Sequence, residues 1–189
     1  MAATPEPPNA PKRAHPHFLW KDLFRKSPNE DSGVIEVLRQ NVLFRTLTQK
    51  ELQYLATQVY ERVYQPDEVI FHQNDRGLGM YVIAKGSVAI KTHAIQPIEA
   101  GEVLVTVLRD GSFFGEVALV DPENIRTATA TAIERSVVIG FFKPDLSEIL
   151  ERKPSMGVKI LFQLATVLGR RLLETTDRIT QMLKEQPDD

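Results

Sequence analysis

The chain has 189 residues, of which 42% are hydrophobic and 25% charged, proportions typical of folded globular proteins that exclude a wholly disordered chain. Its 23 Lys and Arg against 25 Asp and Glu give a formal charge of −2, which argues against a protein built to coat nucleic acid or an anionic membrane. The absence of cysteine excludes disulfides, thiolate nucleophiles and zinc ribbons. No apolar run approaches the ~20 residues of a membrane span, so we expect a cytoplasmic protein.

The N-terminal part is predicted to hold two segments outside the main domain. Residues 1–17 are rich in proline and poor in large apolar residues, which predicts a flexible tail. Residues 18–41 are predicted as a helical extension with one amphipathic helix over Phe18–Phe24 and a second around Val34–Leu38. Residues 42–189 are predicted as one domain, whose first helix opens at the capping-box sequence Thr48–Glu51.

The middle of the chain alternates apolar and polar residues with the period of two that is typical of strands. Turn-forming residues separate these runs, which recur about every ten residues and therefore favour a β-sandwich, barrel or roll over a parallel α/β sheet. Two helices are predicted to follow, a short one over residues 143–151 and a long one over 154–184, each opened by a proline. The predicted strands are Arg62–Tyr64, Val69–Gln73, Tyr81–Ala84, Ser87–Lys91, Val103–Leu108, Thr127–Ile133 and Ser136–Phe142.

Residues 113–132, with the sequence FFGEVALVDPENIRTATATA, hold the residues best suited to bind a ligand. Gly115 permits a backbone conformation closed to other residues, and the next four residues can form one helical turn with free N–H groups. Arg126 then opens a predicted strand on which Ala128, Ala130 and Ala132 share its face, which suggests an open cavity. Glu116 and Arg126 together suit a ligand that carries hydroxyls and a phosphate, but a structural ion pair between the two is an equal alternative on spacing alone.

The same segment resembles the phosphate-binding cassette of the cyclic-nucleotide-binding domain family. The resemblance rests on FGEVAL, the step of ten residues from Glu116 to Arg126, and the Arg126-Thr127-Ala128 that follows. It extends over roughly residues 43–183 and is closest to the catabolite activator branch. It implies an α+β fold: a mainly-β jelly roll or β-roll with N-terminal helices, a hinge helix and a long C-terminal helix.

The resemblance also implies roles for individual residues. Glu116 would accept a hydrogen bond from the ribose 2′-hydroxyl, and Arg126 would neutralise the cyclic phosphate. Thr127 would contact the phosphate or the base. The remaining implied contacts are backbone N–H groups around the phosphate and apolar pocket walls: Gly115, Glu116, Val117 and Ala118 for the N–H groups, and Ile90, Val105 and Phe114 for the walls.

On the long helix, residues 169–176 resemble the stretch that closes over the base in the catabolite activator. Thr175 and Thr176 would then reach the adenine amino group, and Arg171 could brace the carboxylate of Glu116. In the family a threonine after the cassette arginine favours guanine, whereas paired hydroxyls on this helix favour adenine. Both features are present, and we favour cyclic AMP over cyclic GMP.

Apolar residues on the long helix recur at alternating steps of four and three, the spacing of a coiled-coil seam. A helix that packs on its own roll would give a similar stripe near its start, but we expect a parallel homodimer through this helix. Ligand binding and helix order would then be coupled, because a ligand whose base contacts the long helix binds best when that helix is ordered. The predicted seam is Leu161, Ala165, Leu168, Leu172, Thr175, Ile179 and Met182.

Two functions are carried forward from the sequence. The first is a stand-alone cyclic-nucleotide receptor that signals through a protein partner. Only residues 184–189 remain at the end of the long helix, so we expect no DNA-reading helix. The second is an interaction or scaffold subunit that keeps the fold but has lost nucleotide affinity. An enzyme is not expected, since the β-region lacks the clustered His and carboxylates of metal-dependent jelly-roll enzymes, and neither a metal nor a further cofactor is expected.

Overall fold

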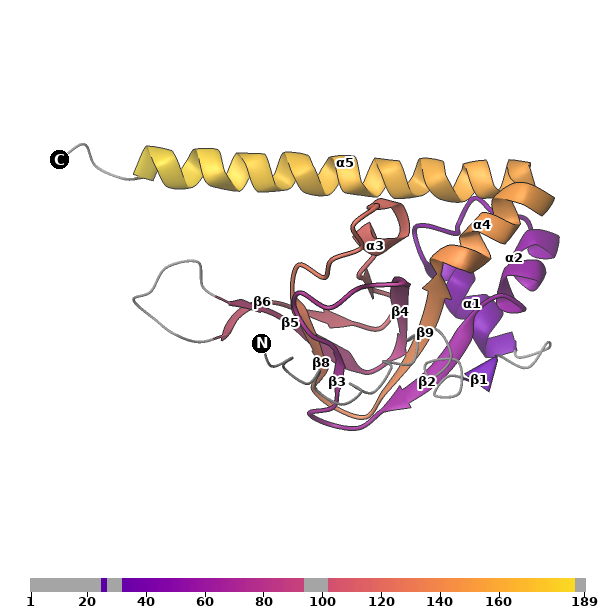
Figure 1. The fold of residues 1–189 in the computed structure, drawn as a ribbon, viewed down its shortest axis with the longest axis horizontal. Coiled ribbons are helices and arrows are strands. Elements are labelled where there is room, and N and C mark those ends of the chain that lie inside the picture. Colours follow the sequence, from indigo (N-terminus) through magenta and orange to yellow (C-terminus); the bar gives the residue numbers. More distant parts are fainter. Residues whose placement is uncertain (1–24, 27–31, 94–101, 186–189) are drawn as a thin grey trace, which may run out of the picture.

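The computed structural model describes residues 25–26, 32–93 and 102–185. In this part of the chain, short helices precede a block of strands and a long helix ends the fold (Figure 1). The helices are α1 (Ser32–Gln40), α2 (Gln49–Ala56), α3 (Val117–Val120), α4 (Lys143–Arg152) and α5 (Pro154–Glu185). The strands are β1 (Arg25–Lys26), β2 (Tyr60–Tyr64), β3 (Val69–Phe71), β4 (Gly79–Lys85), β5 (Ser87–His93), β6 (Glu102–Arg109), β7 (Phe113–Phe114), β8 (Thr129–Ala132) and β9 (Ser136–Phe142).

These elements confirm the predicted α+β roll. Each of the seven predicted strands is present, and β9 has the predicted bounds. The strand predicted over Thr127–Ile133 is shorter, because its first residues belong to a loop that runs alongside the turn before β4. The predicted tail over residues 1–17 and the predicted helix Phe18–Phe24 lie outside the described residues, so the predicted domain division stays a prediction.

Two antiparallel sheets form the roll. Among the described residues, one sheet has the strand order β1-β2-β9-β4-β7 and the other has the order β3-β8-β5-β6. The chain crosses from the first sheet to the second between β4 and β5 at Gly86, whose φ is +104°. A side chain there would be strained and would overlap Ser136, so glycine is required at this crossing.

The buried apolar residues fall into two groups on opposite faces of the first sheet. One group joins α1, α2, α4 and the start of α5 to that sheet and includes Leu38, Phe44, Leu52 and Ile139. The other fills the space between the two sheets and includes Tyr64, Ile83, Val88 and Phe142. The first sheet is therefore buried on both faces, which makes it a rigid support for the loops at its edge.

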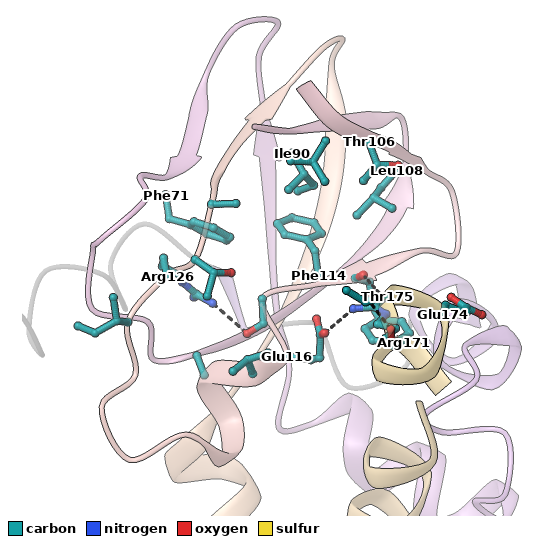
Figure 2. Close-up of a pocket in the computed structure, with 18 of the residues that line it drawn as sticks. Phe71, Ile90, Thr106, Leu108, Phe114, Glu116, Arg126, Arg171, Glu174 and Thr175 are labelled. Atoms are coloured by element: carbon teal, nitrogen blue, oxygen red, sulfur yellow. Dashed lines mark hydrogen bonds and ion pairs between the residues drawn. The ribbon is translucent and has the colours of Figure 1, made fainter. Parts of the chain in front are cut away.

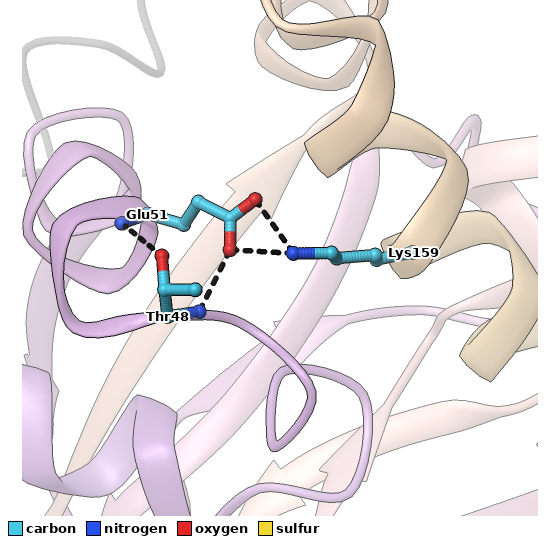
Figure 3. A network of polar contacts seen from close by, with 3 residues as sticks. All are labelled: Thr48, Glu51 and Lys159. Carbon is cyan, nitrogen blue, oxygen red and sulfur yellow. Dashed lines mark hydrogen bonds and ion pairs between the residues drawn. The ribbon is translucent and has the colours of Figure 1, made fainter.

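The root of α5 is fixed to α2 by a polar network (Figure 3). Thr48 and Glu51 form the predicted capping box, in which the Thr48 hydroxyl accepts from the Glu51 N–H and the Glu51 carboxylate accepts from the Thr48 N–H. The ammonium of Lys159 on α5 lies 2.9 Å from both carboxylate oxygens. Burial alone would raise the pKa of Glu51, but these hydrogen bonds outweigh it and hold the pKa below its ordinary value.

Beyond its root, α5 projects past the roll (Figure 1). Leu161 and Leu168, two residues of the predicted seam, are partly buried against the protein's own core. The predicted seam is therefore wrong at these two positions, because a helix face cannot pack on the roll and face a partner at once. Met182 of the seam lies where the side chains are not described.

An exposed row of residues on α5, which we call the α5 stripe, shares Ala165, Leu172 and Ile179 with the predicted seam. Its members recur at steps of four and three over the whole helix. Its large apolar side chains are exposed by 53–69%, far more than buried residues of the same type. The α5 stripe consists of Val158, Phe162, Ala165, Gly169, Leu172, Thr176 and Ile179.

In the part of the chain that the structure describes, no helix is long and apolar enough to cross a membrane. The same residues contain no group of three or more His, Asp or Glu side chains placed to hold a metal ion.

Candidate functional site

The site is built around the short segment between β7 and α3. Gly115 follows β7 directly and has a φ of +71°, the left-handed conformation predicted for it. The predicted single helical turn is α3, which ends where the N–H of Asp121 donates to the carbonyl of Val117. The Ala118 N–H donates to Gly115 O at 3.3 Å, so this one of the predicted phosphate-binding amides is already engaged.

Arg126 lies in the loop that leads into β8, and its backbone is fixed by the turn before β4. Its N–H donates to the carbonyl of Asp75 and its carbonyl accepts from the N–H of Asn74, both at 2.9 Å. The residue is only 4% exposed. Its Nη1 donates to Gly115 O at 2.9 Å, which links the loop to the segment around α3.

Glu116 points toward α5 and forms an ion pair with Arg171 (Figure 2). The side chain of Glu116 is 5% exposed, whereas that of Arg171 is 45% exposed. The Arg171 guanidinium also lies over the Phe113 ring, with Cζ 4.7 Å from its centroid. The structural ion pair between Glu116 and Arg126 that the sequence left open is not formed, since each of the two side chains has a different partner.

These side chains line a pocket with a volume of about 520 Å³, a size typical of small-molecule sites. The pocket collects eleven of the twelve predicted site residues: Ile90, Val105, Phe114, Gly115, Glu116, Val117, Ala118, Arg126, Thr127, Arg171 and Thr175. Thr176 is not among the lining residues; it belongs to the α5 stripe, is exposed, and its hydroxyl donates to the carbonyl of Leu172.

Several lining residues were not predicted from the sequence. They come from β3, from β6, from the cassette, and from the helix positions beside Arg171 and Thr175: Phe71, Thr106, Leu108, Phe113, Ile125, Glu174 and Arg178. Glu174 adds a negative group to the side of the pocket that α5 covers (Figure 2), and Arg178 on the same helix adds a positive one.

One wall of the pocket is aromatic. Phe71 and Phe114 line it with their ring centroids 5.8 Å apart, and the Tyr81 ring packs against them at 5.8 and 5.4 Å. The predicted cavity beside the alanine face is correct only for Ala128, which lines the pocket. Ala130 and Ala132 are fully buried in the core between the sheets, where the large side chains of neighbouring strands fill the space.

The electrostatics of the pocket favour an anionic ligand. Burial lowers the pKa of the Arg126 guanidinium below its ordinary value, because removal from water disfavours the charged form. Its Nε is buried and has no hydrogen-bond acceptor among the described residues. An anion placed against Arg126 would restore both the lost solvation and the missing acceptor. Apolar walls, a buried cation and a carboxylate thus define a site for a small organic anion that also carries a hydroxyl group.

Comparison with known proteins identifies the class. Residues 61–153 match the cyclic nucleotide-binding domain family. The chain is 30% identical over 138 residues to the cyclic AMP receptor protein of Thermus thermophilus, an alignment that covers 72% of this chain and 60% of that protein. The chain therefore contains a cyclic nucleotide-binding domain of the catabolite activator type.

Solved structures agree with this assignment. The Thermus thermophilus catabolite activator protein superposes with a TM-score of 0.66 at 28% identity, covering 75% of this chain and 63% of that one. The N-terminal domain of a transcriptional regulator from Streptomyces coelicolor A3(2) superposes with a TM-score of 0.64 at 29% identity, covering 76% of this chain and 94% of that one. The chain spans about 60% of the length of its Thermus relative.

Proposed function

We propose that the protein is a cyclic-nucleotide receptor that prefers cyclic AMP to cyclic GMP and signals through a protein partner. The observation that carries the proposal is the convergence of Glu116 and Arg126, each about 95% buried, on one pocket closed by α5. The Thermus relative is a cyclic AMP receptor protein, which supports the same ligand here.

The proposed pose follows from the charges. Arg126 would donate to the cyclic phosphate, whose oxygens supply the acceptor that Nε lacks. Thr127 lies next to it in the pocket lining and would donate its hydroxyl to the phosphate or to the base. Glu116 would accept from the ribose 2′-hydroxyl while it keeps Arg171, since a carboxylate has about four lone-pair positions.

The base would then lie between the apolar walls of the roll and α5. Thr175 lines the pocket and its hydroxyl donates to the carbonyl of Arg171 at 2.8 Å, which leaves its oxygen able to accept from an amino group. Adenine carries its amino group at C6, where guanine has a carbonyl oxygen that cannot donate, and this difference is the basis of the proposed preference. Thr176 faces away on the α5 stripe, so in one copy of the chain it would contribute little to the pocket.

The α5 stripe supplies the proposed contact with other proteins. Phe162 and Leu172 are 69% and 68% exposed, and large apolar side chains exposed in a row are typical of an interface. Ala165 and Gly169 lie between them, and small residues allow two helices to approach closely. We propose that a second copy of the chain binds here, in a parallel homodimer.

Titration calorimetry of the full chain with cyclic AMP, cyclic GMP and AMP tests the proposal. We expect saturable binding of both cyclic nucleotides, tighter for cyclic AMP, with AMP much weaker because its dianionic terminal phosphate cannot occupy the same compact position. Absence of binding by either cyclic nucleotide would overturn the receptor assignment and favour the scaffold alternative. Sedimentation of the same sample with and without ligand tests the homodimer.

A further inference from the structure

The guanidinium of Arg126 lies in a slot that two residues outside the cassette create. Its Cζ is 4.1 Å from the centroid of the Phe71 ring on β3 and 5.5 Å from that of Tyr81. Gly77 leaves the space that the guanidinium needs, because a Cβ there would lie 2.6 Å from Nε and 2.7 Å from Cζ. The Phe71 ring and the bare backbone of Gly77 therefore restrict where the planar group can lie.

The slot also leaves part of the guanidinium without a partner. Nη1 is held by the carbonyl of Gly115, whereas Nε is buried without an acceptor in the described part of the chain. A free arginine side chain samples many rotamers, and ordering it on binding costs conformational entropy. Because the Arg126 side chain is already ordered in the slot, this cost does not reduce the affinity for the ligand. A stacked guanidinium keeps a fixed plane, which a lysine ammonium in the same place would not do.

We propose that Phe71 and Gly77 are positioning residues, which hold the Arg126 guanidinium in the plane where it receives the phosphate of the ligand. The proposal rests on the proposed receptor function and adds the part of the site that the cassette does not contain. Phe71 acts through the cation–π contact, whose strength depends on an aromatic face and not on side-chain volume. Gly77 acts by having no side chain.

A simpler role for Phe71 is that of an apolar wall, since it lines the pocket as well. The two roles differ in which ligands they affect. A wall that touches the base or the sugar would stabilise adenosine and cyclic AMP alike. A residue that positions Arg126 would stabilise only ligands with a phosphate.

The first experiment compares Phe71→Leu with Phe71→Tyr, which keeps the aromatic face. Titration calorimetry should show about a tenfold weaker affinity for cyclic AMP in Phe71→Leu, the effect of a desolvated cation–π contact. Its affinity for adenosine should change less than about twofold, and Phe71→Tyr should retain most of the cyclic AMP affinity. Equal losses for adenosine and cyclic AMP, or a Phe71→Tyr variant as weak as Phe71→Leu, would overturn the positioning role alone.

The second experiment needs no ligand. Gly77→Ala should lower the melting temperature by about 3–9 °C, since an inserted methyl group overpacks the slot. In an Arg126→Ala background most of this loss should disappear, apart from the contact of the new Cβ with Ala118. An equal loss from Gly77→Ala in both backgrounds would refute the slot.

The outcomes separate the two proposals. A wild-type chain that binds neither cyclic nucleotide would overturn the receptor function, and the phosphate-positioning role with it. Wild-type binding together with an unchanged cyclic AMP affinity in Phe71→Leu would overturn only the positioning role.

Discussion

Replacement of Arg126 by leucine removes the only buried cation that the described pocket presents to a phosphate. The side chain is 4% exposed, so its hydrogen bonds to an anion would form in a largely desolvated place. A hydrogen bond to a charged group contributes about 1.5–3 kcal/mol, and two such bonds contribute about 3 kcal/mol or more. Since each 1.4 kcal/mol is a tenfold change in affinity, Arg126→Leu should weaken cyclic AMP binding at least about a hundredfold.

The ligand-free protein should respond differently. Burial already lowers the pKa of Arg126, so without an anion the charged group is costly to keep in place. We therefore expect the melting temperature of ligand-free Arg126→Leu to stay close to that of the wild type, while the rise on addition of cyclic AMP disappears. Arg135→Leu, the same change at an exposed turn between β8 and β9, is the control and should leave both quantities unchanged. An unchanged dissociation constant in Arg126→Leu would refute the assignment of Arg126 to the phosphate.

Three other predictions concern the base, the root of α5 and the interface. The double variant Thr175→Ala, Thr176→Ala should weaken cyclic AMP more than cyclic GMP in calorimetry, and equal losses would contradict the adenine assignment. Glu51→Gln should lower the free energy of unfolding by about 0.5–1 kcal/mol at neutral pH. The hydrogen bonds of Glu51 hold its folded-state pKa below the ordinary value of 4.5, so this stabilisation is present above pH 4.5 and is lost as the pH falls through the folded-state pKa. The free energies of unfolding of the two proteins, measured in urea, should therefore become equal in acid. Phe162→Ser should shift sedimentation from dimer to monomer whereas the off-stripe control Arg170→Ser should not; a wild-type chain that is monomeric at all concentrations would refute the interface.

The elements that the sequence predicted well are those with local signals. The capping box at Thr48 and the strand over Ser136–Phe142 depend on neighbouring residues, and the structure has both as predicted. Gly115 was predicted to be left-handed because of its place between a strand and a helical turn, and it is. Local geometry of this kind can be worked out from side-chain type and spacing alone.

The contacts that the sequence did not predict are tertiary. Phe71 and Arg126 are 55 positions apart, and the period-two pattern of β3 does not say that one of its rings will lie under a guanidinium. Glu174 and Arg178 could have been found, because positions three and four apart share a helix face with Arg171 and Thr175.

The seam on α5 shows the limit of periodicity. Two stripes with steps of four and three run along the helix, one through Leu161 and Leu168 and the other through Phe162 and Gly169. Composition favours the first, which has more leucines, but Leu161 and Leu168 pack against the core, whereas Leu172, which the two stripes share, is 68% exposed. Only the packing of α5 on its own roll decides which stripe is free for a partner.

The ion pair between Glu116 and Arg171 connects the pocket to that free face. Glu116 is almost fully buried, so loss of its partner would leave an uncompensated carboxylate, a change that typically destabilises by about 3–5 kcal/mol. Arg171, by contrast, is half exposed and lies on α5 between Gly169 and Leu172 of the α5 stripe. A ligand hydroxyl that donates to Glu116 strengthens the buried end of this link, and an ordered α5 keeps Arg171 in reach. We therefore expect ligand binding and the order of α5 to be coupled. A partner that binds the ordered α5 stripe preferentially would then raise the affinity for the nucleotide by the same factor by which the nucleotide raises the affinity for the partner.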